Sequence, residues 1–118
     1  MNVADFFRGH AEALAIHEAI QTAVAEAGPS EVRVSKSQVG FYRNHPFAAT
    51  WMPGQYLEKR GTPLVLSVYL RRRDDSSRWK EIAEPARGRF THHAELKAVG
   101  DVDDFIRQRL AEAWAEAV

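Results

Sequence analysis

The sequence predicts an α+β fold, in which an N-terminal helix and a C-terminal helix flank about five or six mostly antiparallel strands. Apolar residues recur with helical period over residues 3–27 and again over 101–117, whereas they alternate with polar residues over 31–97. Alternating strands bury only one face, so we expect two layers, with both helices packed on one face of the sheet. At 118 residues, the chain is expected to form a single domain over 1–118.

The first expected element is an amphipathic helix over residues 3–27. Gly9 marks an early kink. Gly28 followed by Pro29 ends the helix, because glycine tolerates the backbone conformation that terminates helices and proline does not continue one. The apolar stripe consists of Val3, Phe6, Phe7, Ala13, Leu14, Ile20 and Val24.

Short alternating segments between the helices are typical of strands: "EVRVS", "SQVGFYR", "FAATWM", "LVLSVYLR", "RWKEIAEP" and "GRFTHHAELK". Turn residues at 44–46 make the second and third segments a hairpin, and residues 74–77 form another turn. Residues 54–63 are expected to form a loop, which leaves room for one helical turn at 56–59.

The last expected element is the helix over residues 101–117. Asp101 follows a glycine and is the expected N-cap, while Asp103 and Asp104 favour the positive end of the helix dipole. Its buried stripe consists of Val102, Phe105, Ile106, Leu110, Ala113 and Trp114.

The composition excludes several classes of chemistry. The chain has no cysteine, which rules out disulfides, thiolate nucleophiles and thiolate metal sites and fits a reducing compartment. Its start lacks the regions of a signal peptide, and no run approaches the ~18 apolar residues of a membrane span. No phosphate-binding glycine loop or dinucleotide fingerprint occurs. We therefore expect a cytoplasmic protein with no cofactor and no membrane partner.

Charge is distributed unevenly along a chain whose net charge is zero. Residues 1–27 and residues 98–118 each carry a net charge of −3, whereas residues 28–97 carry +6. A basic segment is a hint of an anionic partner, although glutamates also gather in helices because they favour that conformation.

The outward-facing set of the strands is the expected functional surface. By alternation it includes Arg33, Ser35, Gln38, Gly40, Tyr42, Thr50, Ser67, Tyr69, Arg71, His93 and Glu95. Arginine offers forked donors for phosphate or carboxylate, and tyrosine offers area with a polar tip. The alternative is a plain solvated sheet face. The candidate ligand-binding residues are Arg33, Lys36, Gln38, Tyr42, Tyr69, Arg71, His93 and Glu95.

The stretch "LRRRDD" places three arginines at the end of a strand. With other bases, these arginines would form a patch for an anionic ligand or nucleic acid. The alternative is a solvated strand end whose arginines pair with Asp74 and Asp75. The further bases of the patch would be Lys36, Arg43, Lys59 and Arg60.

The histidines need separate interpretations. Adjacent residues of a strand point to opposite faces, so His92 and His93 do not easily share a metal ion. His92 lies with apolar neighbours and is expected to be a hydrogen-bonded core residue. His93 and Glu95 share the polar face, either as an ordinary strand pair or as a base with its orienting group, and no metal site is expected. His10 and His17 are seven residues apart and are both expected on the apolar helix face.

Several stretches together resemble a bacterial family catalogued as domain of unknown function 5655. The most characteristic are "VSKSQV" (residues 34–39), "RWKE" (78–81) and "GRFTHHAEL" (88–96), and the resemblance covers nearly the whole chain. It implies a small α+β domain with no established activity. Relatives fused to nuclease-like domains would favour a role near nucleic acid.

Three functions follow as hypotheses. The first is a non-enzymatic binding module that holds an anionic ligand, a small anion or nucleic acid, on the open sheet face. The second is self-association or another protein interaction, with the chain as a monomer or weak homodimer, which exposure of Trp51 or Trp79 would favour. The third is a metal-dependent or acid–base enzyme that uses His93 and Glu95, joined by Tyr69 or Lys36. We rank the binding module first, the interaction domain second and the enzyme third.

Overall fold

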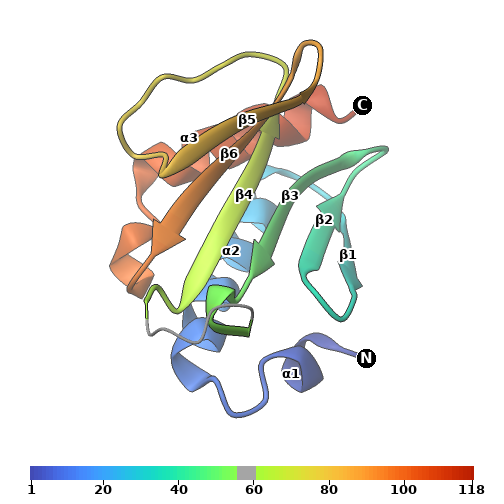
Figure 1. The fold of residues 1–118 in the computed structure, drawn as a ribbon. Helices are drawn as coiled ribbons and strands as arrows, with labels where there is room; N and C mark the ends of the chain where they lie inside the picture. Colours follow the sequence, from blue (N-terminus) through green and yellow to red (C-terminus); the bar gives the residue numbers. More distant parts are fainter. Residues whose placement is uncertain (56–60) are drawn as a thin grey trace.

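The computed structural model describes residues 1–55 and 61–118, so the helical turn expected at 56–59 lies outside the described residues. The α+β fold is confirmed, with helices at both ends and strands between them (Figure 1). In chain order the elements are α1 (Val3–Phe6), α2 (Ala11–Ala27), β1 (Glu31–Val34), β2 (Val39–Tyr42), β3 (Pro46–Trp51), η1 (Pro53–Gln55), β4 (Leu64–Leu70), β5 (Glu81–Ala86), β6 (Arg89–Leu96), η2 (Val99–Asp101) and α3 (Asp104–Glu116).

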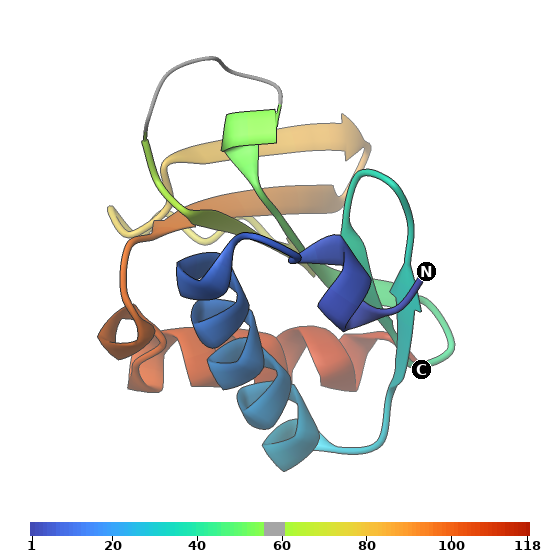
Figure 2. The ribbon, with the colours of Figure 1, turned by 90° about the horizontal axis from the view of Figure 1, so that it is seen from below.

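The strands form one six-stranded sheet in the order β1-β2-β3-β4-β6-β5, and every described pair is antiparallel. Helices α2 and α3 pack together against one face, as expected (Figure 2). The tip of the β1–β2 hairpin rises away from these helices in Figure 2, and so does the β5–β6 pair. The face without helices is therefore concave.

The N-terminal helix is divided, which corrects the expectation of one helix over residues 3–27. Gly9 has φ 81°, a left-handed conformation that interrupts the helical hydrogen-bond pattern between α1 and α2. His10 becomes the exposed N-cap residue of α2. The expectation that His10 lies on the buried face is therefore wrong, whereas His17 is fully buried.

The C-terminal helix starts later than expected. Its N-cap is Asp103, whose carboxylate accepts a hydrogen bond from the Ile106 backbone N–H at 3.1 Å. Asp101 instead accepts hydrogen bonds from the Lys97 and Ala98 N–H groups at 2.8 and 3.2 Å and so closes the preceding 3-10 turn. The two aspartates cap successive elements, so the chain turns sharply between β6 and α3.

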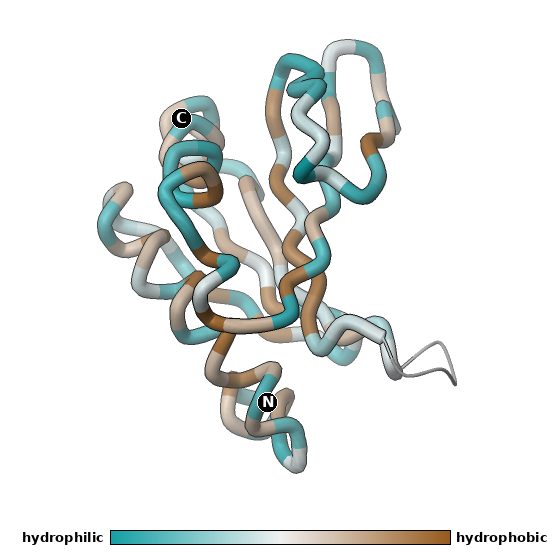
Figure 3. Tube along the Cα trace, turned by 90° about the vertical axis from the view of Figure 1, so that its left-hand side faces the viewer, coloured by the Kyte–Doolittle hydropathy of each residue, from teal (hydrophilic) through white to brown (hydrophobic). Residues whose placement is uncertain are grey.

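The core lies between the sheet and the two long helices. Figure 3 shows hydrophobic positions in brown along both strands and helices. Burial alternates along β1, whereas β4 is buried along nearly its whole length. Thr50 is an exception to the sequence interpretation, which placed it outward. It faces the helices with no exposed surface, and its hydroxyl contacts His17 Nδ1 at 2.8 Å. The largest fully buried side chains are Phe7, Phe41, Phe47, Ile16, Ile20, Leu64, Leu66, Leu96, Ile106, Leu110, His17 and His92.

Candidate functional site

The adjacent histidines of β6 lie on opposite faces of the sheet, as strand alternation predicts. His92 is opposite Val68 in the β4–β6 register and is fully buried, whereas His93 is opposite Ser67 and is half-buried on the open face. The prediction that His92 belongs to the core is confirmed. Of this pair, only His93 is available to a ligand.

Hydrogen bonds and packing satisfy His92 within the protein. Its Nε2 accepts the Asp74 backbone N–H at 2.9 Å, and its Nδ1 lies 3.3 Å from the Val68 carbonyl oxygen. Its ring packs against Trp79, with 5.0 Å between ring centroids, and the Trp79 indole N–H donates to the Asp74 carboxylate at 2.9 Å. Burial lowers the pKa of His92 below its ordinary value. His92 therefore holds the chain after β4 against the sheet.

His93 is held from β4 and β3 on the open face. The Ser67 hydroxyl lies 2.8 Å from His93 Nδ1, and the Trp51 indole N–H donates to the same hydroxyl oxygen at 3.1 Å. The Trp51 and His93 rings meet edge to face, with 6.2 Å between their centroids. Burial lowers the pKa of His93, while the nearby Glu81 carboxylate acts in the opposite direction. The ring therefore has a fixed orientation.

A groove of about 760 Å³ lies on the open face around His93 and continues over the end of β4 to the last turn of α3. Its walls mix aromatic, aliphatic and polar side chains. The lining residues are Ser37, Gln38, His45, Pro46, Phe47, Trp51, Ser67, Tyr69, Leu70, Arg71, Pro85, Arg89, Phe90, Thr91, His93, Ala113, Glu116 and Ala117.

Four of the eight candidate residues line this groove: Gln38, Tyr69, Arg71 and His93. Burial raises the pKa of Tyr69 above its ordinary value, so its phenol keeps its proton and can donate a hydrogen bond. Arg71 is directed toward α3: its guanidinium donates to the Glu116 carbonyl oxygen at 2.8 Å, and its backbone N–H donates to the Glu116 carboxylate at 2.9 Å.

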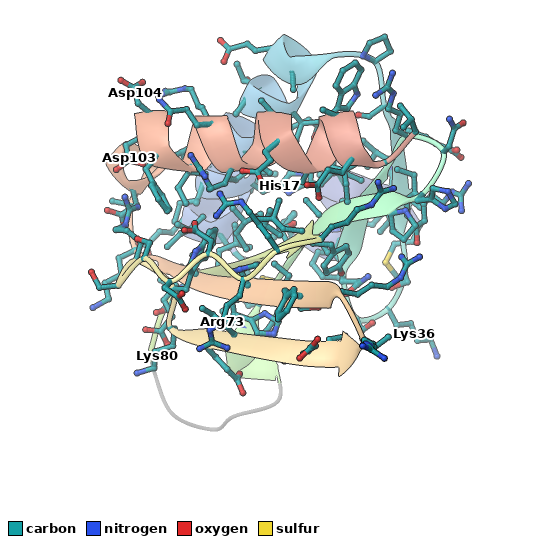
Figure 4. All side chains as sticks on the ribbon, turned by 90° about the horizontal axis from the view of Figure 1, so that it is seen from above. His17, Lys36, Arg73, Lys80, Asp103 and Asp104 are labelled. Atoms are coloured by element: carbon teal, nitrogen blue, oxygen red, sulfur yellow. The ribbon has the colours of Figure 1, made fainter. Side chains whose placement is uncertain are left out.

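The other four candidates lie outside the groove lining. The Arg33 guanidinium covers the Tyr42 ring at 4.0 Å from the centroid and bonds Glu31 at 3.1 Å. Lys36 is exposed and points away from the body of the molecule (Figure 4). Glu95 is exposed opposite Val65, two residues along β6 from His93. The structure therefore does not gather all eight side chains.

Arginines of the "LRRRDD" stretch are engaged by acids. Arg72 contacts Glu112 at 2.7 Å and Asp74 at 3.7 Å, and Arg73 contacts Asp75 at 2.7 Å. This arrangement matches the alternative in which the strand end is paired with acids. Arg43 stacks on the Trp114 ring at 3.7 Å. Lys59 and Arg60 lie outside the described residues.

The sequence interpretation missed several lining residues. Arg89 and Thr91 have the same strand parity as His93, so alternation along β6 would have placed them on the open face. Trp51 was considered only as an interaction residue, and its indole N–H could have indicated a polar partner. The contribution of α3 to the groove has no signal in the sequence, because it depends on tertiary packing.

The described residues contain neither a metal-binding cluster nor a helix that could span a membrane. Within residues 1–55 and 61–118, no three His, Asp or Glu side chains gather in a way that could hold a metal ion. Over the same ranges, the helices are too short or too polar to cross a membrane.

The fold and the groove define a small α+β protein with an open, concave sheet face. The chain belongs to the family described as "Domain of unknown function (DUF5655)", whose model matches residues 3–117. The resemblance seen in the sequence is thus confirmed over nearly the whole chain. No curated protein and no solved structure matches it.

Proposed function

We propose that this chain is a cytoplasmic, non-enzymatic binding domain whose open-face groove takes a small monoanion with an apolar body. The groove itself carries this proposal. Its volume of about 760 Å³ falls within the range of small-molecule sites. Apolar walls with a few convergent polar groups are typical of such sites. Trp51, Tyr69 and Phe90 offer surface to the body of the ligand, and Gln38 and His93 offer hydrogen bonds.

Charge favours a monoanion over nucleic acid. The charged residues of the lining are Arg71, Arg89 and Glu116, a net charge of +1 with neutral histidines. Nucleic-acid affinity grows with the number of cations that contact phosphates. Figure 4 shows Lys36 well apart from Arg73 and Lys80. A groove with one excess positive charge is matched by a ligand with one carboxylate.

Arg89 is the cation best placed to meet the anion. It starts β6 at the rim of the groove and is exposed. The ion pairs among the described residues do not include it. Its neighbour Arg87 is also exposed but lies outside the lining, which makes Arg87 a matched control.

The alternatives have less support from the geometry. An interaction surface would be favoured by exposed apolar residues, but Trp79 is 7% exposed. Among the described residues, the exposed large hydrophobic side chains are Met1, Val99 and Val118. In the enzyme hypothesis Glu95 orients His93, whereas Ser67 is the side chain at hydrogen-bond distance from the His93 ring.

The test is a ligand-observed NMR titration with benzoate, indole-3-acetate, inorganic phosphate and a single-stranded oligonucleotide at low salt. We expect the two carboxylates to bind and Arg89→Gln to weaken their binding about two- to fivefold, the size expected for one exposed charge contact. Arg87→Gln should leave their affinity unchanged. Equal losses in both variants, or no carboxylate binding, would contradict the proposal. Oligonucleotide binding that falls steeply with salt would replace the monoanion with nucleic acid.

A further inference from the structure

We propose that Trp51 and Ser67 are positioning residues that hold His93 in the neutral tautomer with its hydrogen on Nε2. The groove then presents an N–H donor to an acceptor oxygen of the ligand, a carboxylate or carbonyl. This inference rests on the proposed function for the ligand and on hydrogen-bond geometry for the tautomer. It names the polar group that the groove recognises.

The direction of the hydrogen bonds follows from the donors available. The Trp51 indole N–H only donates, so the Ser67 oxygen accepts at this 3.1 Å contact. Ser67 is 3% exposed, so its own hydroxyl hydrogen needs an acceptor inside the protein. Among the described residues, the recorded partner for that hydrogen is His93 Nδ1 at 2.8 Å.

The tautomer of His93 follows from this chain of bonds. A neutral imidazole carries one hydrogen, and the nitrogen that accepts a bond does not carry it. Since Nδ1 of His93 accepts from Ser67, the hydrogen lies on Nε2. Nε2 of His93 makes no hydrogen bond within the described residues, and the ring lines the groove. The N–H group is therefore available to a ligand.

His92 provides an internal reference with the opposite tautomer. The Asp74 backbone N–H is a donor, so His92 Nε2 accepts it at 2.9 Å. His92 Nδ1 then carries the hydrogen and donates to the Val68 carbonyl at 3.3 Å. Two adjacent histidines of one strand thus carry their hydrogens on opposite nitrogens, because each face of the sheet supplies a different partner.

A neutral donor gives the groove selectivity. An acceptor oxygen placed at His93 gains a hydrogen bond, whereas an N–H group placed there meets another donor and leaves both unpaired. Phenyl ligands with different polar groups probe this preference together with the charge of the groove. Benzoate presents acceptors, whereas benzylamine presents donors of the opposite charge.

The tautomer is measured by long-range ¹H–¹⁵N NMR of histidine-labelled protein. In the wild type we expect hydrogen on Nε2 of His93 and on Nδ1 of His92. Ser67→Ala should release His93 into a mixture of tautomers, Ser67→Thr should restore the single tautomer, and His92 should keep its tautomer in both variants. Trp51→Phe should partly release His93. A wild-type His93 with hydrogen on Nδ1, or a Ser67→Ala spectrum identical to the wild type, would overturn the inference.

Binding is measured on the same variants with benzoate as the probe. We expect Ser67→Ala to weaken benzoate by about 3- to 10-fold, as for loss of one positioned hydrogen bond, and Ser67→Thr to recover it. A released tautomer with unchanged benzoate affinity would overturn the positioning role. If the wild type shows the expected tautomers but does not bind benzoate, recognition of this carboxylate is overturned and the tautomer assignment remains supported. The two failures are therefore distinguishable.

Discussion

Lowering the pH from 7 to 5 should destabilise this protein through His17. The ring is fully buried between Phe7 and Phe41, with centroid separations of 4.9 and 5.7 Å. Its Nδ1 contacts Thr50 Oγ1 at 2.8 Å and its Nε2 contacts Gln21 Oε1 at 3.0 Å. Burial, partly offset by the bond to Gln21, lowers the pKa of His17 from 6.5 to about 4. Protonation therefore places a charge among aromatic rings.

The sign and size of the effect follow from proton linkage. The folded pKa of His17 lies below its unfolded value, so the unfolded chain binds the proton more tightly. The contribution to stability is complete above the unfolded pKa of 6.5 and is lost as the pH falls toward about 4. The loss between pH 7 and pH 5 is about 2 kcal/mol, and it approaches about 3 kcal/mol in stronger acid. Burial also lowers the pKa values of His92 and His93, which act with the same sign.

The assay compares urea unfolding of the wild type and of His17→Gln at a series of pH values from 7 to 4.5. Glutamine removes the titrating group and retains an amide that can bond the Thr50 hydroxyl. The difference in unfolding free energy between the two proteins isolates His17 from the other histidines and the carboxylates. We expect this difference to shrink by about 2 kcal/mol between pH 7 and pH 5. A difference that stays constant with pH, or an NMR titration that gives His17 a pKa near its ordinary value of 6.5, would refute the reasoning.

Two further predictions concern stability. His92→Ala should lower the unfolding free energy by about 2–4 kcal/mol, because it leaves a core cavity and unpaired backbone groups. His93→Ala should lower it by about 1 kcal/mol or less. Urea unfolding of both variants provides the comparison. Gly28→Ala should destabilise the protein by about 1–3 kcal/mol, since a Cβ at residue 28 would lie 2.2 Å from the Trp114 ring. Gly54→Ala serves as the control, because a Cβ there meets nothing within 4 Å. Equal melting temperatures for these two variants would contradict the clash.

Local pattern predicted the fold because apolar and polar residues alternate in strands such as β1 and β6, even though β4 is buried along nearly its whole length. In β6 the alternation separated His92 from His93 without knowledge of the neighbouring strands, because backbone geometry alone sets the side-chain direction. The prediction for Thr50 was wrong. It was assigned to the outward polar set of the strands, but it faces the helices, where α2 supplies His17 as a buried partner. Whether a polar strand residue can face the core depends on a buried partner, which the strand sequence does not contain.

The groove was less predictable than the face on which it lies. Its shape depends on the curvature of the sheet, including the irregular pairing of β2 with β3 between Phe41 and Tyr42. The direction of Arg71 depends on the last turn of α3, because Glu116 accepts both of its hydrogen bonds. Alternation identified open-face residues such as Tyr69 and His93, but only tertiary structure separates those that line the groove from those that stand in solvent.

The uneven charge along the chain also acquires a different meaning in three dimensions. The basic middle segment is neutralised in part by the acidic C-terminal segment: Arg72 pairs with Glu112 at 2.7 Å, and Arg78 pairs with Asp103 at 2.7 Å. A segment charge of +6 therefore does not create a surface of six free cations. Arg89 lies at the groove, outside these pairs. The same sequence feature that suggested a polyanionic partner thus favours, once the strands and α3 are brought together, a ligand with a single negative charge.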